Sequence, residues 1–256
     1  MAISAQLPWL LTVMLVSVRL GVVVIMTPVF SLIGLPVKIR VLFVLALSAT
    51  LVSGMEPGFA APAIDSPGSL ALAAAHEFLI GSLLAFGLLA GFAAFQFAGR
   101  IMDIQLGFGV AGLIDPTTRA PAPLLGTVLN MAAVLTFFVI GGHRLLLKGL
   151  AFSLQQIPPG SAFRGVPLDQ VLAQFGAMFV FAALLAAPVM TVVLLVDIAM
   201  AVMARTMPQM NVFIIGLPLK ILVGLIVLAI SLGFLGPAFS LVFEGIFTGW
   251  QALLTH

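Results

Sequence analysis

Long apolar stretches dominate the sequence and restrict the folds that are open to it. They cover residues 7–30, 37–55, 70–98, 124–140, 171–203 and 212–243. Most of them reach or exceed the roughly 20 residues with which an α-helix spans the hydrocarbon core of a bilayer. Charged residues make up only 7% of the chain, too few for the surface of a soluble domain. The sequence therefore predicts an all-α integral membrane protein with about six hydrophobic helical segments, in a single domain over residues 1–256.

The charge, the cysteine content and the motifs exclude several classes of function. The formal net charge is +2 and the basic residues are scattered, so no basic run could follow a phosphate backbone and we expect no nucleic-acid partner. Cysteine is absent, which excludes disulfides, thiolate metal sites and cysteine nucleophiles. The sequence has no H-E-x-x-H or G-x-S-x-G motif and no paired carboxylates. We therefore expect no enzyme, no cofactor and no metal site.

Basic residues in alternate connections predict the orientation in the membrane. One set of connections carries Lys38, Arg40, Arg100, Arg119 and Arg205, and the other carries Arg144, Lys148 and Arg164. By the positive-inside rule the first set faces the cytoplasm. The N-terminus is then expected on the outer side.

Proline and glycine interrupt the apolar stretches and divide the chain. Prolines lie between or inside these stretches at positions 28, 36, 188, 208, 218 and 237. Broken helices are tolerated in a membrane only where neighbouring protein satisfies the freed backbone groups, so we expect a packed, assembled environment. Three connections are expected, over residues 56–68, 99–123 and 141–170.

Four ionisable residues lie inside the apolar stretches, namely Arg19, Glu77, Asp197 and Lys220. An unpaired charge at bilayer depth costs at least a few kcal/mol. Each residue is therefore expected to pair within the chain, to contact another subunit or to line a water-filled path, and we favour pairing or subunit contact. An alternative function is a secondary transporter of small molecules or ions, in which Arg19 and Asp197 would be the coupling charges.

Gly87 and Gly91 form a small-xxx-small pair within the third apolar stretch. Small residues let helix backbones approach closely in lipid, so the pair predicts helix packing. A chance pair in a glycine-rich chain remains the alternative.

Gly107, Gly109 and Gly112 spell the G-x-G-x-x-G pattern of a dinucleotide-binding turn. That turn needs a strand before the glycines and a helix directly after them, whereas Pro116 and Pro121 follow here. We reject a nucleotide site and predict an irregular loop over residues 105–123. Irregular backbone at membrane depth lies inside protein or against a water-filled cavity, so the loop either lines or plugs a pore, or is an ordinary surface connection.

The order and spacing of many residues resemble the FliR family of flagellar export proteins over nearly the whole chain. In the first half these are Arg19, Pro28-Val29-Phe30, Pro36-Val37, Arg40, Gln96, Gly99-Arg100-Ile101, Asp103, Gln105, Gly107-Phe108-Gly109 and Asp115-Pro116. In the second half they are Phe137-Phe138, Gly141-Gly142-His143, Ser153, Pro158, Pro188, Asp197, Arg205, Pro208-Gln209-Met210-Asn211-Val212-Phe213, Pro218 and Lys220.

The resemblance implies a non-enzymatic structural and gating subunit of the type III protein export gate. Proteins like FliR assemble as helical hairpins with FliP and FliQ, contact FlhB and FlhA, and surround a channel for unfolded flagellar export substrates. They reside in the bacterial inner (cytoplasmic) membrane, in contact with its lipid, at the flagellar basal body. The related virulence injectisome has a corresponding subunit with the same pattern, and this second system stays open.

The resemblance also assigns roles to residues of this chain. The plug that occludes the channel in the family corresponds to residues 106–121 and includes Gly107, Phe108, Gly109, Val110, Gly112, Leu113, Ile114, Asp115 and Pro116. Apart from the resemblance, we expect intramembrane charge or assembly roles for Arg19, Glu77, Asp197, Arg205, Gln209 and Lys220.

Overall fold

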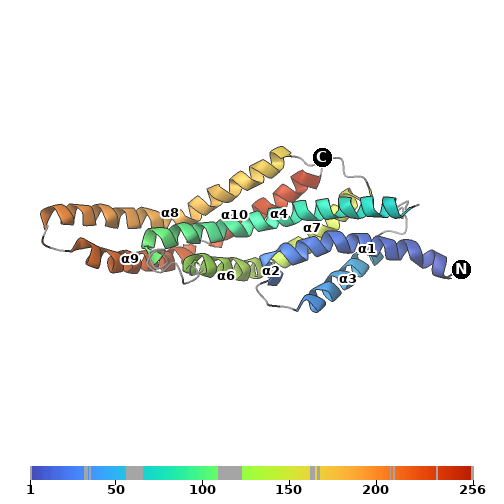
Figure 1. Ribbon diagram of the computed structural model, residues 1–256, viewed down its shortest axis with the longest axis horizontal. Coiled ribbons are helices and arrows are strands. Elements are labelled where there is room, and N and C mark those ends of the chain that lie inside the picture. Colours follow the sequence, from blue (N-terminus) through green and yellow to red (C-terminus); the bar gives the residue numbers. More distant parts are fainter. Residues whose placement is uncertain are drawn as a thin grey trace. The chain divides into compact units, whose positions relative to one another are not determined.

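The computed structural model is helical along nearly all the residues that it describes, which confirms the predicted all-α class (Figure 1). It describes residues 2–31, 34, 36–55, 66–108, 123–161, 165, 168–207, 209, 211–234 and 236–254. No strand occurs within these ranges. The helices are α1 (Ala2–Met26), α2 (Pro28–Ser31), α3 (Val37–Ser53), α4 (Pro67–Leu106), α6 (Leu124–Val139), α7 (Gly142–Gln156), α8 (Leu168–Thr206), α9 (Val212–Phe234) and α10 (Gly236–Leu254).

Within the described residues, 4 helices are long and apolar enough to cross a membrane, namely α1, α4, α8 and α9. The number rises to 5 if α6 and α7 together form one broken span. Gly141 separates these two helices and has a φ of 76°, a left-handed conformation that glycine adopts without steric cost.

Three predicted boundaries were wrong. Helix α4 continues through Gly99 to Leu106, because Met102 and Leu106 are buried and extend its apolar face. The predicted connection over residues 141–170 contains α7. The last apolar stretch is divided between α9 and α10.

Helix α7 lies outside the predicted apolar stretches because it is amphipathic. It buries Leu146, Leu150 and Leu154, spaced four residues apart, while Arg144 and Lys148 are exposed. A stripe at this spacing marks a helix with one buried face, and its charges lower the mean hydropathy of the segment.

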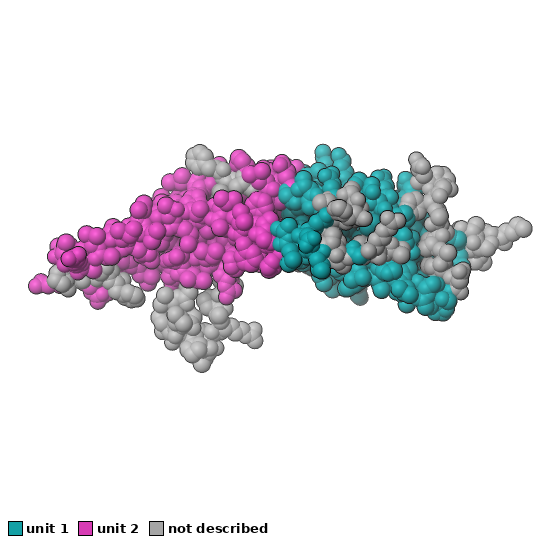
Figure 2. Space-filling model, turned by 90° about the horizontal axis from the view of Figure 1, so that it is seen from above, with its two compact units in different colours: residues 1–90, 141–174, 245–256 teal, residues 91–140, 175–244 magenta. Residues whose placement is uncertain are grey.

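The chain divides into two compact units, which Figure 2 shows in different colours. Unit 1 contains residues 1–90, 141–174 and 245–256, and unit 2 contains residues 91–140 and 175–244. Each unit combines segments that are far apart in the sequence, so no single cut separates them. The single domain over residues 1–256 stays a prediction.

Each unit has its own apolar core. In unit 1, α1 packs against α3, and the buried side chains of α1 include Leu15, Val16 and Leu20. In unit 2, five buried phenylalanine rings form one cluster, in which the centroids of the contacting pairs lie 4.6–6.0 Å apart: Phe92, Phe95, Phe137, Phe239 and Phe243. Aromatic pairs at such distances add to the burial of their apolar area.

Candidate functional site

Arg19 of α1 lies at the centre of a buried polar network in unit 1. Its Nε donates to Glu77 Oε2 at 2.7 Å and its Nη2 donates to Glu77 Oε1 at 3.1 Å. Both side chains are fully buried. The two parallel hydrogen bonds form the bidentate arrangement in which a guanidinium binds a carboxylate most strongly.

The same guanidinium also holds the C-terminal end of α7 and the residues after it. Nη1 donates to the backbone carbonyl of Ser153 at 3.0 Å and to its hydroxyl at 3.3 Å. Nη2 donates to the carbonyl of Ile157 at 3.0 Å, and Gly160 N–H donates to Glu77 Oε1 at 3.0 Å. All five N–H donors of a guanidinium are thereby used, so Arg19 joins helices and has no donor left for a ligand.

Gly81 brings α1 and α4 close enough for this ion pair to form. A Cβ on Gly81 would lie 2.6 Å from the carbonyl oxygen of Arg19 and 3.1 Å from its Cα. Glu77 lies one turn before Gly81 on the same face of α4. The small residue therefore sets the spacing at which Glu77 reaches Arg19.

Asp197 of α8 and Lys220 of α9 form a second ion pair, in unit 2. The Nζ of Lys220 lies 2.8 Å from Asp197 Oδ1, and the two side chains are 20% and 41% exposed, respectively. This pair joins two apolar helices at a place where both charges still reach the surface of the chain. The structure thus brings the four intramembrane charges together as two separate pairs.

Asp103 of α4 binds the beginning of α6 within unit 2. Its Oδ1 accepts from the N–H of Leu125 at 3.1 Å and its Oδ2 accepts from the N–H of Gly126 at 3.4 Å. Both helices flank the loop that the sequence marks as a candidate plug. Of that loop, Gly107 and Phe108 are described and half-buried, and Gly107 has a φ of 87°.

The other predicted plug residues, from Gly109 to Pro116, lie outside the described residues. Of the residues predicted for charge or assembly roles, Arg205 and Gln209 are exposed. Gly91 is buried, and Gly87 lies against Trp250, whose Nε1 would be 2.8 Å from a Cβ at position 87.

Trp250 is a packing residue that the sequence analysis missed. It is 1% exposed, and its indole N–H donates to the carbonyl of Leu84 at 3.0 Å. Gly87 and Gly149 both provide the space that this ring occupies. Periodicity gives no sign of the contact, because Trp250 and Leu84 are 166 residues apart.

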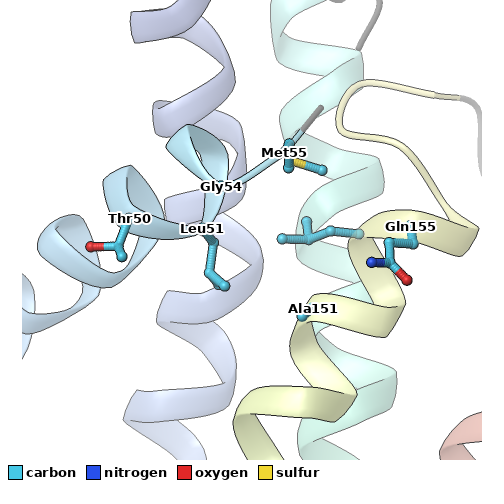
Figure 3. Close-up of a pocket in the computed structure, with 7 residues that line it drawn as sticks. Thr50, Leu51, Gly54, Met55, Ala151 and Gln155 are labelled. Atoms are coloured by element: carbon cyan, nitrogen blue, oxygen red, sulfur yellow. The ribbon is translucent and has the colours of Figure 1, made fainter. Parts of the chain in front are cut away.

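A cavity of about 560 Å³ lies between the end of α3 and the end of α7 in unit 1. Figure 3 shows Thr50, Leu51 and Gly54 on one side and Ala151 and Gln155 on the other. None of the described residues that line it has an ionisable side chain. Among the described residues, no cluster of three or more His, Cys, Asp or Glu side chains could hold a metal ion.

Comparison with known proteins places these features in a family. The family described as "Bacterial export proteins, family 1" matches residues 10–246. The flagellar biosynthetic protein FliR of Bacillus subtilis is 35% identical over 225 residues, which cover 86% of this chain and 85% of that protein. FliR of Escherichia coli is 29% identical over 228 residues, or 86% and 84% of the two chains.

The Yop proteins translocation protein T of Yersinia pestis is 30% identical over 165 residues, or 63% of each chain. The family model and the two FliR relatives cover most of the chain, in agreement with the resemblance read from its motifs. The chain belongs to family 1 of the bacterial export proteins.

Proposed function

We propose that this chain is a non-enzymatic structural and gating subunit of the flagellar type III protein export gate. The observation that carries the proposal is the family match over residues 10–246 together with the similarity to FliR. The proposed location is the bacterial inner membrane at the flagellar basal body. The Yersinia relative is named for the translocation of Yop proteins, so a related secretion system is the second candidate.

The uncovered apolar faces of α8 and α9 support a role in an assembly. Within the single chain, only 28% of an apolar 18-residue part of the candidate membrane span in α8 and 22% of such a part in α9 are buried, whereas 61% of such a part in α4 is buried. An apolar surface of this extent needs lipid or another protein to cover it. Lipid alone fits poorly beside the partly exposed pair of Asp197 and Lys220, because charges in hydrocarbon are costly.

The proposed partners are the other subunits of the gate, FliP and FliQ, together with FlhB and FlhA. Unfolded flagellar export substrates would pass through the channel that these subunits enclose. In this assembly, residues 107–116 of the chain are proposed to plug the channel. The glycines at 107, 109 and 112 favour this role because glycine adopts backbone conformations that other residues do not.

Deletion of residues 109–114 in the assembled complex tests the function. We expect ion leak across the membrane to increase and export of flagellar substrates to change, while the subunits still purify together. A deletion of equal length over residues 58–63, in another predicted connection, is the matched control and should leave leak unchanged. Unchanged leak and export in the first deletion would refute the plug.

The transporter alternative receives no support from the comparisons. Arg19, one of the two coupling charges in that alternative, is fully buried, and Glu77, Ser153 and Ile157 accept all its hydrogen bonds. A transporter would move its solute when the chain is reconstituted alone in vesicles. We expect the chain alone to move none.

A further inference from the structure

Helix α6 begins without a cap of its own. Its N-cap residue is Pro123, which makes no side-chain hydrogen bond. The first backbone N–H groups of a helix have no partner within the helix and need an acceptor from elsewhere. Leu125 and Gly126, the second and third residues of α6, are buried, so water cannot freely supply that acceptor.

Asp103 supplies the missing acceptor from another helix. Its two carboxylate oxygens accept from the N–H groups of Leu125 and Gly126, at 3.1 and 3.4 Å. These are the donors that the side chain of a helix's own N-cap residue usually binds. Asp103 is only 5% exposed and belongs to neither ion pair found among the described residues. The carboxylate thus faces the positive end of the α6 dipole.

The backbones of α4 and α6 also touch beside this carboxylate. A Cβ on Gly99, one turn before Asp103, would overlap with the N and Cα atoms of Gly126. A Cβ on Gly126 would lie 3.2 Å from the carbonyl oxygen of Gln96. We call Gly99, Asp103 and Gly126 the α4–α6 clamp, since they join the two helices by backbone contact and by hydrogen bonds.

The clamp lies at both ends of the segment over residues 107–123. Asp103 is three residues before Leu106, where α4 ends, and Leu125 is the second residue of α6. One turn further along α4, Leu106 packs into the space left by Gly224 of α9, and Leu217 packs against Gly107. The residues at which the segment starts and finishes are thus fixed to each other and to α9.

We propose that Asp103 is a positioning residue that ties the two ends of this segment together. Loss of the tie, as in Asp103→Asn, should loosen the base of the proposed plug and so raise ion leak through the channel. This inference rests on the proposed function, because a tie at this place affects gating only if residues 107–116 occlude a channel. The tie itself rests on the described contacts and is tested separately.

Amide hydrogen exchange of the assembled complex tests the tie directly. In Asp103→Asn one acceptor oxygen becomes an NH₂ donor, so Leu125 and Gly126 cannot both keep their acceptors. We expect their amides to exchange at least about tenfold faster than in the unchanged protein. Asp169→Asn, an exposed residue in the first turn of α8, is the matched control. Unchanged exchange at Leu125 and Gly126 in Asp103→Asn would overturn the proposal.

A second substitution separates the tie from simple helix capping. Pro123→Ser places a hydroxyl at the N-cap, where it can accept from the third helical N–H, but it makes no link to α4. In Asp103→Asn with Pro123→Ser, we expect slow exchange at Gly126 to return while ion leak stays raised. If the second substitution also abolishes the leak, Asp103 only caps α6 and the proposal is wrong.

The deletion of residues 109–114 distinguishes failure of the tie from failure of the plug. A leak in the deletion but none in Asp103→Asn would overturn the positioning role and leave the proposed function intact. Faster exchange in Asp103→Asn, with no leak in either variant, would overturn the plug and leave the tie between the helices standing.

Discussion

Arg19→Met removes a guanidinium that makes five hydrogen bonds inside unit 1. The methionine side chain fills much of the same volume but donates no hydrogen bond. Glu77 then stays fully buried, and Gly160 N–H is the donor that remains to it among the described residues. The variant therefore isolates the consequence of leaving one charge of a buried pair without its partner.

The expected loss of stability is about 3–5 kcal/mol, the range for removing one partner of a buried ion pair. This corresponds to a decrease of roughly 150-fold to 4,000-fold in the ratio of folded to unfolded chain. Arg19→Met combined with Glu77→Leu should recover most of the loss, since apolar side chains of similar volume often replace a buried pair at little cost. Lys220→Met leaves Asp197 without its partner at a place where the pair is partly exposed, so the loss should be smaller than in Arg19→Met.

Titration with sodium dodecyl sulfate in mixed micelles, followed by tryptophan fluorescence, measures these differences. The chain has 2 tryptophans, and Trp9→Phe leaves only Trp250, which is 1% exposed and belongs to unit 1 with Arg19. A loss below about 1 kcal/mol in Arg19→Met would contradict a stabilising role for the buried pair. So would a double variant that is less stable than Arg19→Met alone.

Two further predictions concern packing. Gly81→Ala should destabilise the chain by about 1–3 kcal/mol in the same titration, because its Cβ would lie 2.6 Å from the carbonyl oxygen of Arg19. The control is Gly176→Ala in α8, whose Cβ would meet nothing within 4 Å, so this variant should be neutral or stabilising. Equal losses of stability at the two sites would contradict the close contact at Gly81. With unfolding followed by far-UV circular dichroism, because these variants lack the fluorescent Trp250, Trp250→Phe should lose about 0.5–1.5 kcal/mol with the hydrogen bond to Leu84. Trp250→Ala should lose about 3–5 kcal/mol, and equal losses in the two variants would contradict a contribution from ring packing.

Hydropathy predicts much of this fold because the long helices are uniformly apolar. Helices α1, α4, α8 and α9 all lie within or around the predicted stretches. The same signal fails for α7, whose buried leucines alternate with exposed basic residues. It also fails at Gly99, which suggests a loop in the sequence but provides the close approach of α4 to α6 in the structure.

The contacts of the candidate site could also be predicted only in part from the sequence. Burial of Arg19 and Glu77 could be expected from the apolar residues around them, because a charge in such a stretch needs a partner. The choice of Glu77 as the partner of Arg19 could not be predicted, since the two residues are 58 positions apart. The close contact at Gly81 decides which carboxylate is in reach. The role of Asp103 was equally hidden, because helix caps are sought in the residue just before the helix, which here is Pro123.

The most direct test of the central claim is the mass of the complex that purifies with this chain from membranes in mild detergent, measured by native mass spectrometry. We expect a hetero-oligomer that contains FliP and FliQ and is several times heavier than the 26.7 kDa chain. A lone species of 26.7 kDa under conditions that keep other membrane complexes intact would contradict a role as a gate subunit.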